Sequence, residues 1–340
     1  MTDFEFKEIN ENESCDPNNI VKDIPFTQAN FYGKWQKNVG RDVKRFIVYK
    51  DKKEMAYFQI IKYKVILNKC YLYIPYGPIT NDQSESFLIQ LKIFLTKYAK
   101  ENNAIFVRLD FTPNISDEIL SKHFTKSPLY SYKSAYFQPR LEWYLSLKDD
   151  EKTILMNMHE KTRYSVRLSE RKDIKVKTIT ENFLEYFDEF YLLMKATADR
   201  NGFNIHDIKY YSKIFDDLKN IKNSFLSIAS YNDKILAIDL IIPFGKVANY
   251  VYGASSNDER NRMPTYLAQW NAIIYSKKIG YEYYNFGAIN EESSDHRSWE
   301  GITTFKKKFG GEVVKHSDFF DIVTQPLWYH IYNLRKKFKK

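Results

Sequence analysis

The sequence predicts an α/β (α+β) fold made of two tandem domains of one design, each with a mixed sheet flanked by helices. Three observations carry this prediction. The 340 residues suffice for about two domains of ordinary size. The order helices, three meandering strands, helix, strand occurs twice along the chain. A Tyr-Gly pair stands in the third strand of each copy, at 76–77 and at 252–253, an offset of 176 residues.

The first copy begins with a predicted hairpin of strands 44–50 and 54–65, and a third strand follows over 70–79. Residues 84–103 are predicted to form a helix. Residues 104–110 (AIFVRLD) then read as a strand that ends on an acid.

The second copy repeats this order. Strands 224–230 and 234–244 form the predicted hairpin, and 249–256 is the third strand. A helix is expected over 264–280, because proline at its first position and glycine at its end are typical helix limits. The strand 281–287 closes the copy.

Other segments connect or follow the two copies. Two strands are predicted, a connecting strand over 138–147 and a later one over 312–323. One helix is predicted to begin near 151, and further helices cover 182–200, 207–219, 299–311 and, as a basic final helix, 326–340. The predicted first domain comprises residues 1–145 together with about 318–340, and the predicted second domain residues 146–317.

Composition limits the classes of function. A hydrophobic fraction of 44% excludes a disordered chain, and a net charge of +9 favours anionic partners such as nucleic acid, phosphorylated substrates or an anionic membrane face. The two cysteines, Cys15 and Cys70, form no metal-binding or disulfide motif, so no metal is expected. The acidic N-terminus and the lack of an apolar run long enough to span a bilayer predict a cytoplasmic protein.

The element order is that of N-acyltransferase-like domains, but the expected coenzyme A cradle is absent. Such a cradle needs a glycine-rich turn whose N–H groups face a pyrophosphate at a helix N-terminus. Residues 260–265 read RNRMPT, in which Met263 and Thr265 stand where glycines are needed and Pro264 lacks an N–H group. An acyl donor other than coenzyme A is therefore expected.

Seven segments in register resemble the FemABX family of peptidoglycan-bridge aminoacyltransferases. They are YIPYGPIT (73–80), FVRLDFTP (106–113), QPRLEWYLSL (138–147), HEKTRYSVRLSERKDIKV (159–176), YVYGASSNDERNRMPTYLAQW (250–270), YYNFGAIN (283–290) and TTFKKKFGGEVV (304–314). The resemblance covers about residues 25–325. Between Asn204 and Ser224 there is space for only one helix, so the chain is similar to the compact FemX type, which lacks a coiled-coil arm.

The resemblance implies two GNAT-like domains and a tRNA-dependent transfer. An amino acid would pass from aminoacyl-tRNA, the co-substrate, to an amino group of a UDP-linked or lipid-linked muropeptide, with no other cofactor. Peripheral contact with the inner membrane face is a further expectation, because lipid-linked precursors reside there.

The resemblance places two catalytic residues, Lys306 and Asp110. Lys306, beside the substrate-binding Phe305, would stabilise the oxyanion of the tetrahedral intermediate or hold a phosphate of the terminal nucleotide. The alternative is a solvated member of the lysine run 306–308. Asp110 would act as base or orient the amine, and the alternative is a cap at the strand end.

Four further residues are expected to bind the acceptor. Lys37 matches a phosphate-binding lysine of the family, and Tyr210 and Tyr252 match residues that contact the muropeptide. His206 stands where the FemX pattern has arginine, which makes its phosphate contact dependent on pH. Alternatives are a polar helix-start residue for His206 and a core tyrosine for Tyr252.

A basic helical face is expected to bind tRNA. Arg163 and Arg167 belong to this face within KTRYSVRLSERK (161–172), and with Lys307 they are the predicted tRNA-binding residues. A solvated surface helix is the alternative for the face. The basic tail 335–340 could contact tRNA or the anionic membrane.

Two other functions stay open from the sequence. One is N-acyl transfer by the same scaffold to another envelope or polysaccharide amine. The other is a non-enzymatic module that binds RNA or envelope precursors.

Overall fold

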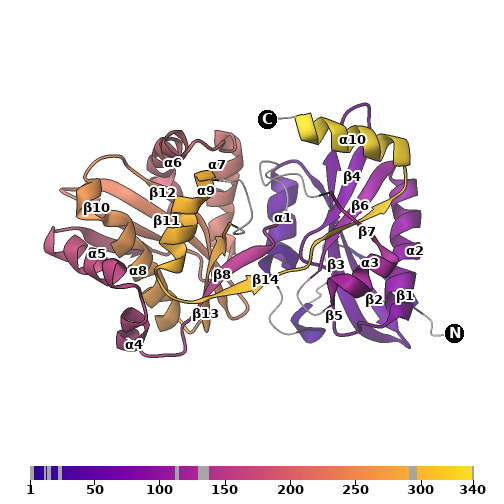
Figure 1. The fold of residues 1–340 in the computed structure, drawn as a ribbon, viewed down its shortest axis with the longest axis horizontal. Helices are drawn as coiled ribbons and strands as arrows, with labels where there is room; N and C mark the ends of the chain where they lie inside the picture. Colours follow the sequence, from indigo (N-terminus) through magenta and orange to yellow (C-terminus); the bar gives the residue numbers. More distant parts are fainter. Residues whose placement is uncertain are drawn as a thin grey trace. The chain divides into compact units, whose positions relative to one another are not determined.

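A computed structural model describes residues 4–10, 13, 17–21, 25–111, 115–128, 138–290 and 297–338. The chain divides into two compact units, Met1–Arg140 with Lys315–Lys340 and Leu141–Val314 (Figure 1). Each unit has its own sheet, and the chain returns to the first unit at its C-terminal end.

The first unit contains an eight-stranded mixed sheet. Its strands are β1 (Phe4–Ile9), β2 (Asp42–Lys50), β3 (Lys53–Lys64), β4 (Cys70–Ile74), β5 (Ile79–Thr80), β6 (Ala104–Asp110), β7 (Thr125–Lys126) and β15 (Phe319–Val323), and its helices are α1 (Asn30–Asn38), α2 (Glu85–Glu101), α3 (Asp117–His123) and α10 (Pro326–Phe338). The strand order is β1-β2-β3-β4-β6-β15-β7, with β5 paired to β3. Strands β4 and β6 are parallel, and α2 connects them.

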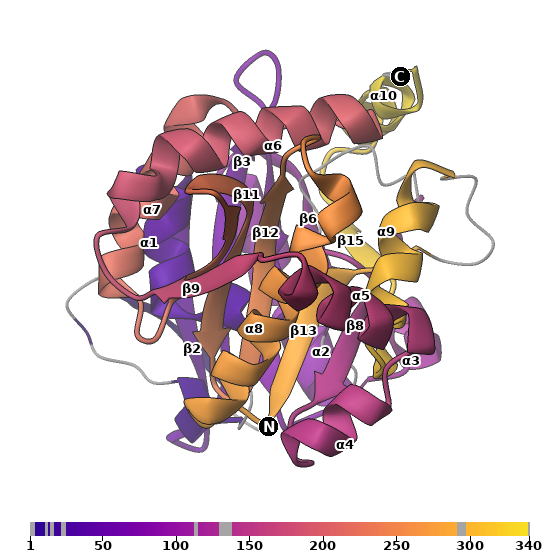
Figure 2. The ribbon, with the colours of Figure 1, turned by 90° about the vertical axis from the view of Figure 1, so that its left-hand side faces the viewer.

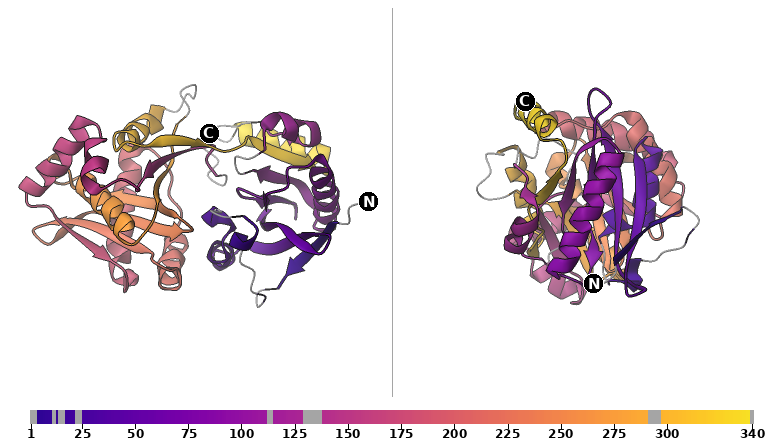
Figure 3. Two further views of the ribbon diagram at one scale, coloured as in Figure 1. Left: turned by 90° about the horizontal axis from the view of Figure 1, so that it is seen from below. Right: turned by 90° about the vertical axis from the view of Figure 1, so that its right-hand side faces the viewer.

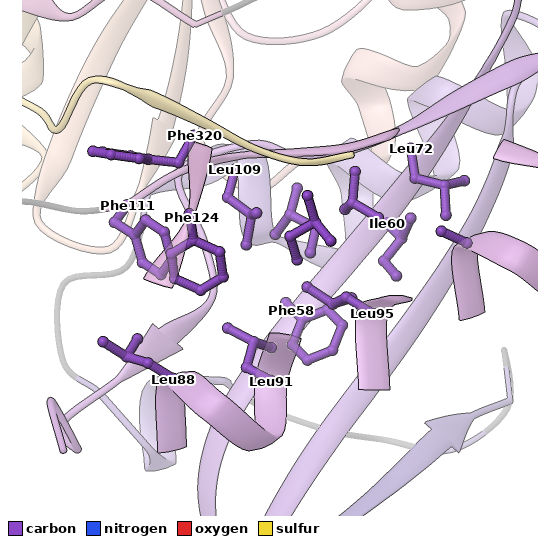
Figure 4. Packing of buried hydrophobic residues seen from close by; sticks show 14 of the residues in the cluster. Phe58, Ile60, Leu72, Leu88, Leu91, Leu95, Leu109, Phe111, Phe124 and Phe320 are labelled. Carbon is purple, nitrogen blue, oxygen red and sulfur yellow. The ribbon is translucent and has the colours of Figure 1, made fainter. Parts of the chain in front are cut away.

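Helices cover both faces of the first sheet. Helix α2 lies along one face of the sheet (Figure 3). Its Leu91 and Leu95 pack there against Leu72 and Leu109 (Figure 4). Tyr71 of β4 points to the opposite face, because neighbouring strand residues alternate, and there it packs with residues of α10. The first unit therefore has helix layers on both sides of a buried sheet.

The second unit contains a seven-stranded mixed sheet. Its strands are β8 (Leu141–Ser146), β9 (Lys175–Ile179), β10 (Phe225–Tyr231), β11 (Lys234–Phe244), β12 (Val247–Ser255), β13 (Tyr283–Ala288) and β14 (Glu312–Lys315), and its helices are α4 (Glu151–Met156), α5 (Glu160–Arg171), α6 (Phe187–Asn201), α7 (Ile208–Asp217), α8 (Pro264–Lys278) and α9 (Arg297–Lys307). The strand order is β14-β8-β13-β12-β11-β10-β9. Strands β12 and β13 are parallel over 247–249 and 283–285.

Helices α8 and α6 lie on opposite faces of the second sheet. Helix α8 lies in front of the strands in Figure 2, and its Ala268 packs with Ala237 of β11. Tyr252 of β12 pairs with Leu240 of β11, which lies three residues after Ala237 and therefore on the other face of the sheet. The ring of Tyr252 lies 6.5 Å from that of Phe190 in α6. The side chain of Tyr252 therefore belongs to the α6 face.

The predicted α/β class with two mixed sheets flanked by helices is confirmed, and two predicted strands need correction. The run 70–79 ends as a strand at Ile74, because Pro75 and Pro78 lack the N–H groups that a ladder uses; β5 then pairs with β3. The run 312–323 is two strands, β14 beside β8 and β15 beside β6, because residues 316–318 leave the ladder. Among the helices of the described ranges, none combines the length and the apolar character needed to cross a membrane.

Candidate active site

Lys306 is a buried lysine in α9. Helical spacing turns Thr303 and Lys306 inward, and Phe309 in the turn after the helix is also buried, whereas Lys307 and Lys308 are half-buried. The side chain of Lys306 is 5% exposed, and its Nζ donates a hydrogen bond of 2.6 Å to the carbonyl oxygen of Ala288 at the end of β13. Lys306 is therefore not a solvated member of the lysine run.

Burial lowers the pKa of Lys306 to about 8, and the charge of Glu142 opposes this change. The ammonium is the main form at neutral pH, since its pKa stays above 7. An ammonium has three N–H groups, and the hydrogen bond to Ala288 uses one of them. The group can therefore donate to a negative oxygen that develops beside it.

Phe305 precedes Lys306 and packs within the second unit. Its ring lies 5.1 Å from the ring of Tyr266 in α8 and 5.1 Å from that of Phe309. The edge-on contact with Tyr266 packs α9 against α8. The position of the lysine thus depends on an aromatic cluster of its own unit.

Asn285 organises the strand end that receives Lys306. Its Nδ2 donates to Glu142 Oε1 at 3.1 Å and to Asn249 Oδ1 at 3.2 Å, and its Oδ1 accepts from the N–H of Gly287 at 2.7 Å. Gly287 has a φ of +74°, a left-handed conformation that favours glycine. This bend directs the following carbonyl, that of Ala288, toward Lys306.

Glu142 also belongs to this site and was not among the predicted site residues. Glu142 is buried in β8 and is the only charged residue of this mostly apolar strand, LEWYLS. An acid inside such a run is a usable signal, because carboxylates are seldom buried without partners. Its partner on β13 lies 143 positions away, so the sequence alone does not reveal the pairing.

We expect Glu142→Gln to move the alkaline limb of the pH–rate profile to lower pH. Glu142 is the carboxylate whose charge raises the pKa of Lys306, so its loss lets Lys306 deprotonate earlier. The measurement is the single-turnover rate constant for transfer between pH 6.5 and 9. Glu142→Asp, which keeps the charge, should restore part of the shift, and coincident profiles for Glu142→Gln and wild type would contradict the coupling.

Asp110 lies buried at the end of β6 in the first unit. Its Oδ2 accepts from the hydroxyl of Tyr73 at 2.5 Å, and its Oδ1 accepts from the N–H of Tyr76 at 2.6 Å. Burial raises the pKa of Asp110 well above its usual range, while these two hydrogen bonds lower it. The carboxyl group holds the turn after β4, and action on an amine stays a prediction.

Three predicted acceptor residues lie together on the α6 face of the second sheet. The hydroxyls of Tyr210 and Tyr252 are 3.4 Å apart, and the ring of His206 stacks on Tyr210 at 3.9 Å. Asp207 positions them, because its Oδ1 caps α7 by accepting from the N–H of Tyr210 at 2.8 Å. The side chains are half-buried, so polar groups are concentrated at an accessible place.

The other predicted binding residues occupy different surroundings. Lys37 is exposed on α1 of the first unit, and Arg167 is exposed on α5. Arg163 donates from Nη1 to the carbonyls of Met156, at 2.9 Å, and Met158, so it stabilises the end of α4. The Nζ of Lys307 lies 5.7 Å from the ring centre of Trp143. Lys37 and Asp110 thus belong to the first unit, and the other predicted residues to the second.

A second buried acid, Asp239 in β11, was also missed. It is 4% exposed, receives a hydrogen bond from Tyr250, and its Oδ2 has no partner among the described residues. A Cβ at Gly253 would lie 1.6 Å from the hydroxyl of Tyr250, so only glycine leaves room for the pair of Asp239 and Tyr250.

The glycine of the first Tyr-Gly pair, residues 76–77, has a similar role. A Cβ at Gly77 would lie 2.7 Å from Gln28 Nε2. At both positions, the lack of a Cβ leaves space for a neighbouring polar side chain.

Comparison with known proteins identifies the class. The FemAB family matches residues 21–128, 129–234 and 219–337, so the chain belongs to the FemAB family. It is 22% identical to the Lipid II:glycine glycyltransferase of Staphylococcus haemolyticus over 79% of this chain and 80% of that protein. The protein of the same name from Staphylococcus aureus is 22% identical over 60% and 64%, respectively.

Solved structures share the fold. A crystal structure of FemX has a TM-score of 0.80 and 21% identity, and the match covers 98% of this chain and 100% of that one. A tandem GNAT protein of the clavulanic acid biosynthesis pathway has a TM-score of 0.57 and 9% identity over 94% and 98%. The predictions of a FemABX-type protein and of two tandem GNAT-like domains are confirmed.

Proposed function

We propose that this chain is a tRNA-dependent aminoacyltransferase that adds an amino acid to an amino group of a peptidoglycan precursor during cross-bridge synthesis. The observation that carries the proposal is the buried ammonium of Lys306, held at the end of β13 in a member of the FemAB family. Relatives that span most of the chain are glycyltransferases that, by name, act on lipid II, so the enzyme class is that of an aminoacyltransferase.

The reaction is the aminolysis of an ester. The acceptor amine attacks the ester carbonyl, a C–N bond forms, and the carbonyl oxygen becomes an oxyanion. The C–O bond to the ribose then breaks, and the proton lost by the amine goes to the ribose oxygen. Lys306 supplies a positive charge and N–H groups for the oxyanion. It suits this role because its hydrogen bond to Ala288 uses only one of the three N–H groups of the ammonium.

The acceptor is proposed to be a muropeptide bound by Lys37, His206, Tyr210 and Tyr252. The phenol pair of Tyr210 and Tyr252 offers donors and acceptors to a peptide or sugar. The relatives' name favours a lipid-linked acceptor, for which the enzyme works at the inner membrane face. Asp110 is proposed to orient the acceptor amine through the turn that it holds.

The donor is proposed to be aminoacyl-tRNA, with no further cofactor. Exposed Arg167 and the half-buried Lys307 are available for RNA phosphates, whereas Arg163 contributes through the end of α4 that it stabilises. Contacts of this kind weaken steeply with salt.

The test is transfer from a mixed pool of aminoacyl-tRNAs to UDP-linked and lipid-linked muropeptides, followed by mass spectrometry of the product. A muropeptide heavier by one amino acid supports the proposal and identifies both the amino acid and the acceptor. Transfer from acetyl-CoA to another amine, without transfer to muropeptide, would favour the alternative N-acyltransferase. Salt-sensitive RNA binding without turnover of any ester would favour a binding module.

A further inference from the structure

A strained turn exposes two apolar side chains at one end of the first unit. The turn joins β3 to β4, and the N–H of Lys69 donates to the carbonyl of Ile66 at 3.0 Å. Leu67 and Asn68 both have positive φ, +52° and +55°, which is the geometry of a type I′ turn. Asparagine and glycine favour this geometry, and leucine does not. Leu67 is nevertheless 74% exposed.

Helix α10 carries exposed leucines at the same end of the unit. Leu327 is 71% exposed, and Leu334, seven residues later, lies on the same side of the helix and is also exposed. The turn touches the start of α10 through Lys69, whose Nζ lies 2.7 Å from Gln325 Oε1 and 5.4 Å from the ring centre of Trp328. Figures 1 and 2 show the turn between β3 and β4 and the helix at one end of the first unit.

Both segments are basic and contain no acidic residue. Neither 62–73 nor 324–340 has an Asp or Glu. Their basic residues are Lys62, Lys64, Lys69, Arg335, Lys336, Lys337, Lys339 and Lys340. Neighbouring elements add two acids at this end, Asp42, which pairs with Lys62 across β2 and β3, and Glu101 at the end of α2, whose next residue, Asn102, bonds Lys62. The basic residues of the two segments outnumber these acids, so this end of the unit is positively charged.

We infer that this end of the first unit docks on an anionic lipid bilayer. Its docking surface consists of Ile66, Leu67, Leu327 and Leu334 with the basic residues of 62–73 and 324–338. Exposed apolar side chains beside clustered lysines match the two components of an anionic interface, an apolar boundary and negative headgroups. RNA would use the lysines but gives no reason for strained, exposed leucine. The inference rests on the proposed function, because a lipid-linked acceptor places the enzyme at that surface.

The test is co-sedimentation with vesicles, without any substrate. Wild type should bind vesicles of equal parts phosphatidylglycerol and phosphatidylcholine, and bind phosphatidylcholine alone at least about tenfold less. Leu67→Asn and Leu327→Gln should each weaken binding about fivefold, and Arg335→Gln with Lys337→Gln by more than tenfold. Ile93→Gln is the matched control, because Ile93 is 57% exposed on α2 of the same unit, and it should bind as wild type.

Leu67→Asn separates binding from folding. Asparagine suits a positive φ better than leucine, so this variant should be at least as stable as wild type while it binds vesicles less well. Equal binding to both vesicle types, or full binding by Leu67→Asn and Leu327→Gln, overturns the inference. A dimer in sedimentation velocity that Leu67→Asn dissociates, without vesicle binding, also overturns it in favour of a second copy.

The proposed function is tested separately. If docking is correct, Leu67→Asn should transfer to a soluble UDP-linked muropeptide at the wild-type rate and lose rate only with an acceptor embedded in vesicles. Transfer by wild type without vesicle binding removes the docking inference and leaves the transferase. Vesicle binding without transfer to either acceptor removes the proposed function.

Discussion

Lys306→Met is expected to lower kcat for aminoacyl transfer by about a hundredfold to a thousandfold, the usual cost of losing an oxyanion donor. Methionine keeps most of the side-chain volume but removes the charge and the donors. The N–H groups of Lys306 that Ala288 does not use are the ones proposed to meet the oxyanion. The measurement is kcat and KM with saturating muropeptide and varied aminoacyl-tRNA.

The split between kcat and KM separates the two roles considered for Lys306. Loss of an oxyanion donor lowers kcat, because the interaction exists only in the transition state. Loss of a phosphate contact raises KM for aminoacyl-tRNA and leaves kcat unchanged. Lys308→Met, which removes a neighbouring charge that is half-buried, is the control and should retain kcat. A wild-type kcat for folded Lys306→Met would remove the catalytic assignment.

Local signals made much of the fold predictable. The helix over 264–280 is observed as Pro264–Lys278, since proline at the first turn marks its start. Strand 104–110 is observed as Ala104–Asp110. The division of 312–323 between two sheets was not predictable, because it depends on partners far away in the chain, β8 for one strand and β6 for the other. Sheet membership is a long-range property.

The site was only partly predictable for the same reason. The family pattern identifies Lys306, but a run of three lysines does not reveal that only this one is buried. Its surroundings come from β8 and β13, through Glu142 and Asn285, which pair across 143 positions. For Arg163 the sequence pattern predicted a binding role that the structure does not require. Its place on a basic helical face suggests RNA binding, but its guanidinium donates to backbone carbonyls of its own unit.

Asp239→Asn is expected to stabilise the protein increasingly as pH rises from 5 to 7. Burial raises the pKa of Asp239 from 3.8 to about 8 in the folded state, despite the hydrogen bond from Tyr250. Between these two values the folded state holds a proton that the unfolded state releases, so stability falls as pH rises. The slope is about 1.4 kcal/mol per pH unit, or about 3 kcal/mol over this range. Asparagine resembles the protonated acid and carries no such cost.

The measurement is the free energy of unfolding in urea for Asp239→Asn and wild type at several pH values. The difference between the two proteins isolates Asp239, because every other residue is the same in both. Asp258→Asn serves as the control, since the hydrogen bond from Lys234 lowers the pKa of this exposed carboxyl and its titration lies below pH 5. Its difference from wild type should stay constant with pH. A constant difference for Asp239→Asn as well would mean that the buried acid is already ionised in the folded protein, with Tyr250 as a sufficient partner.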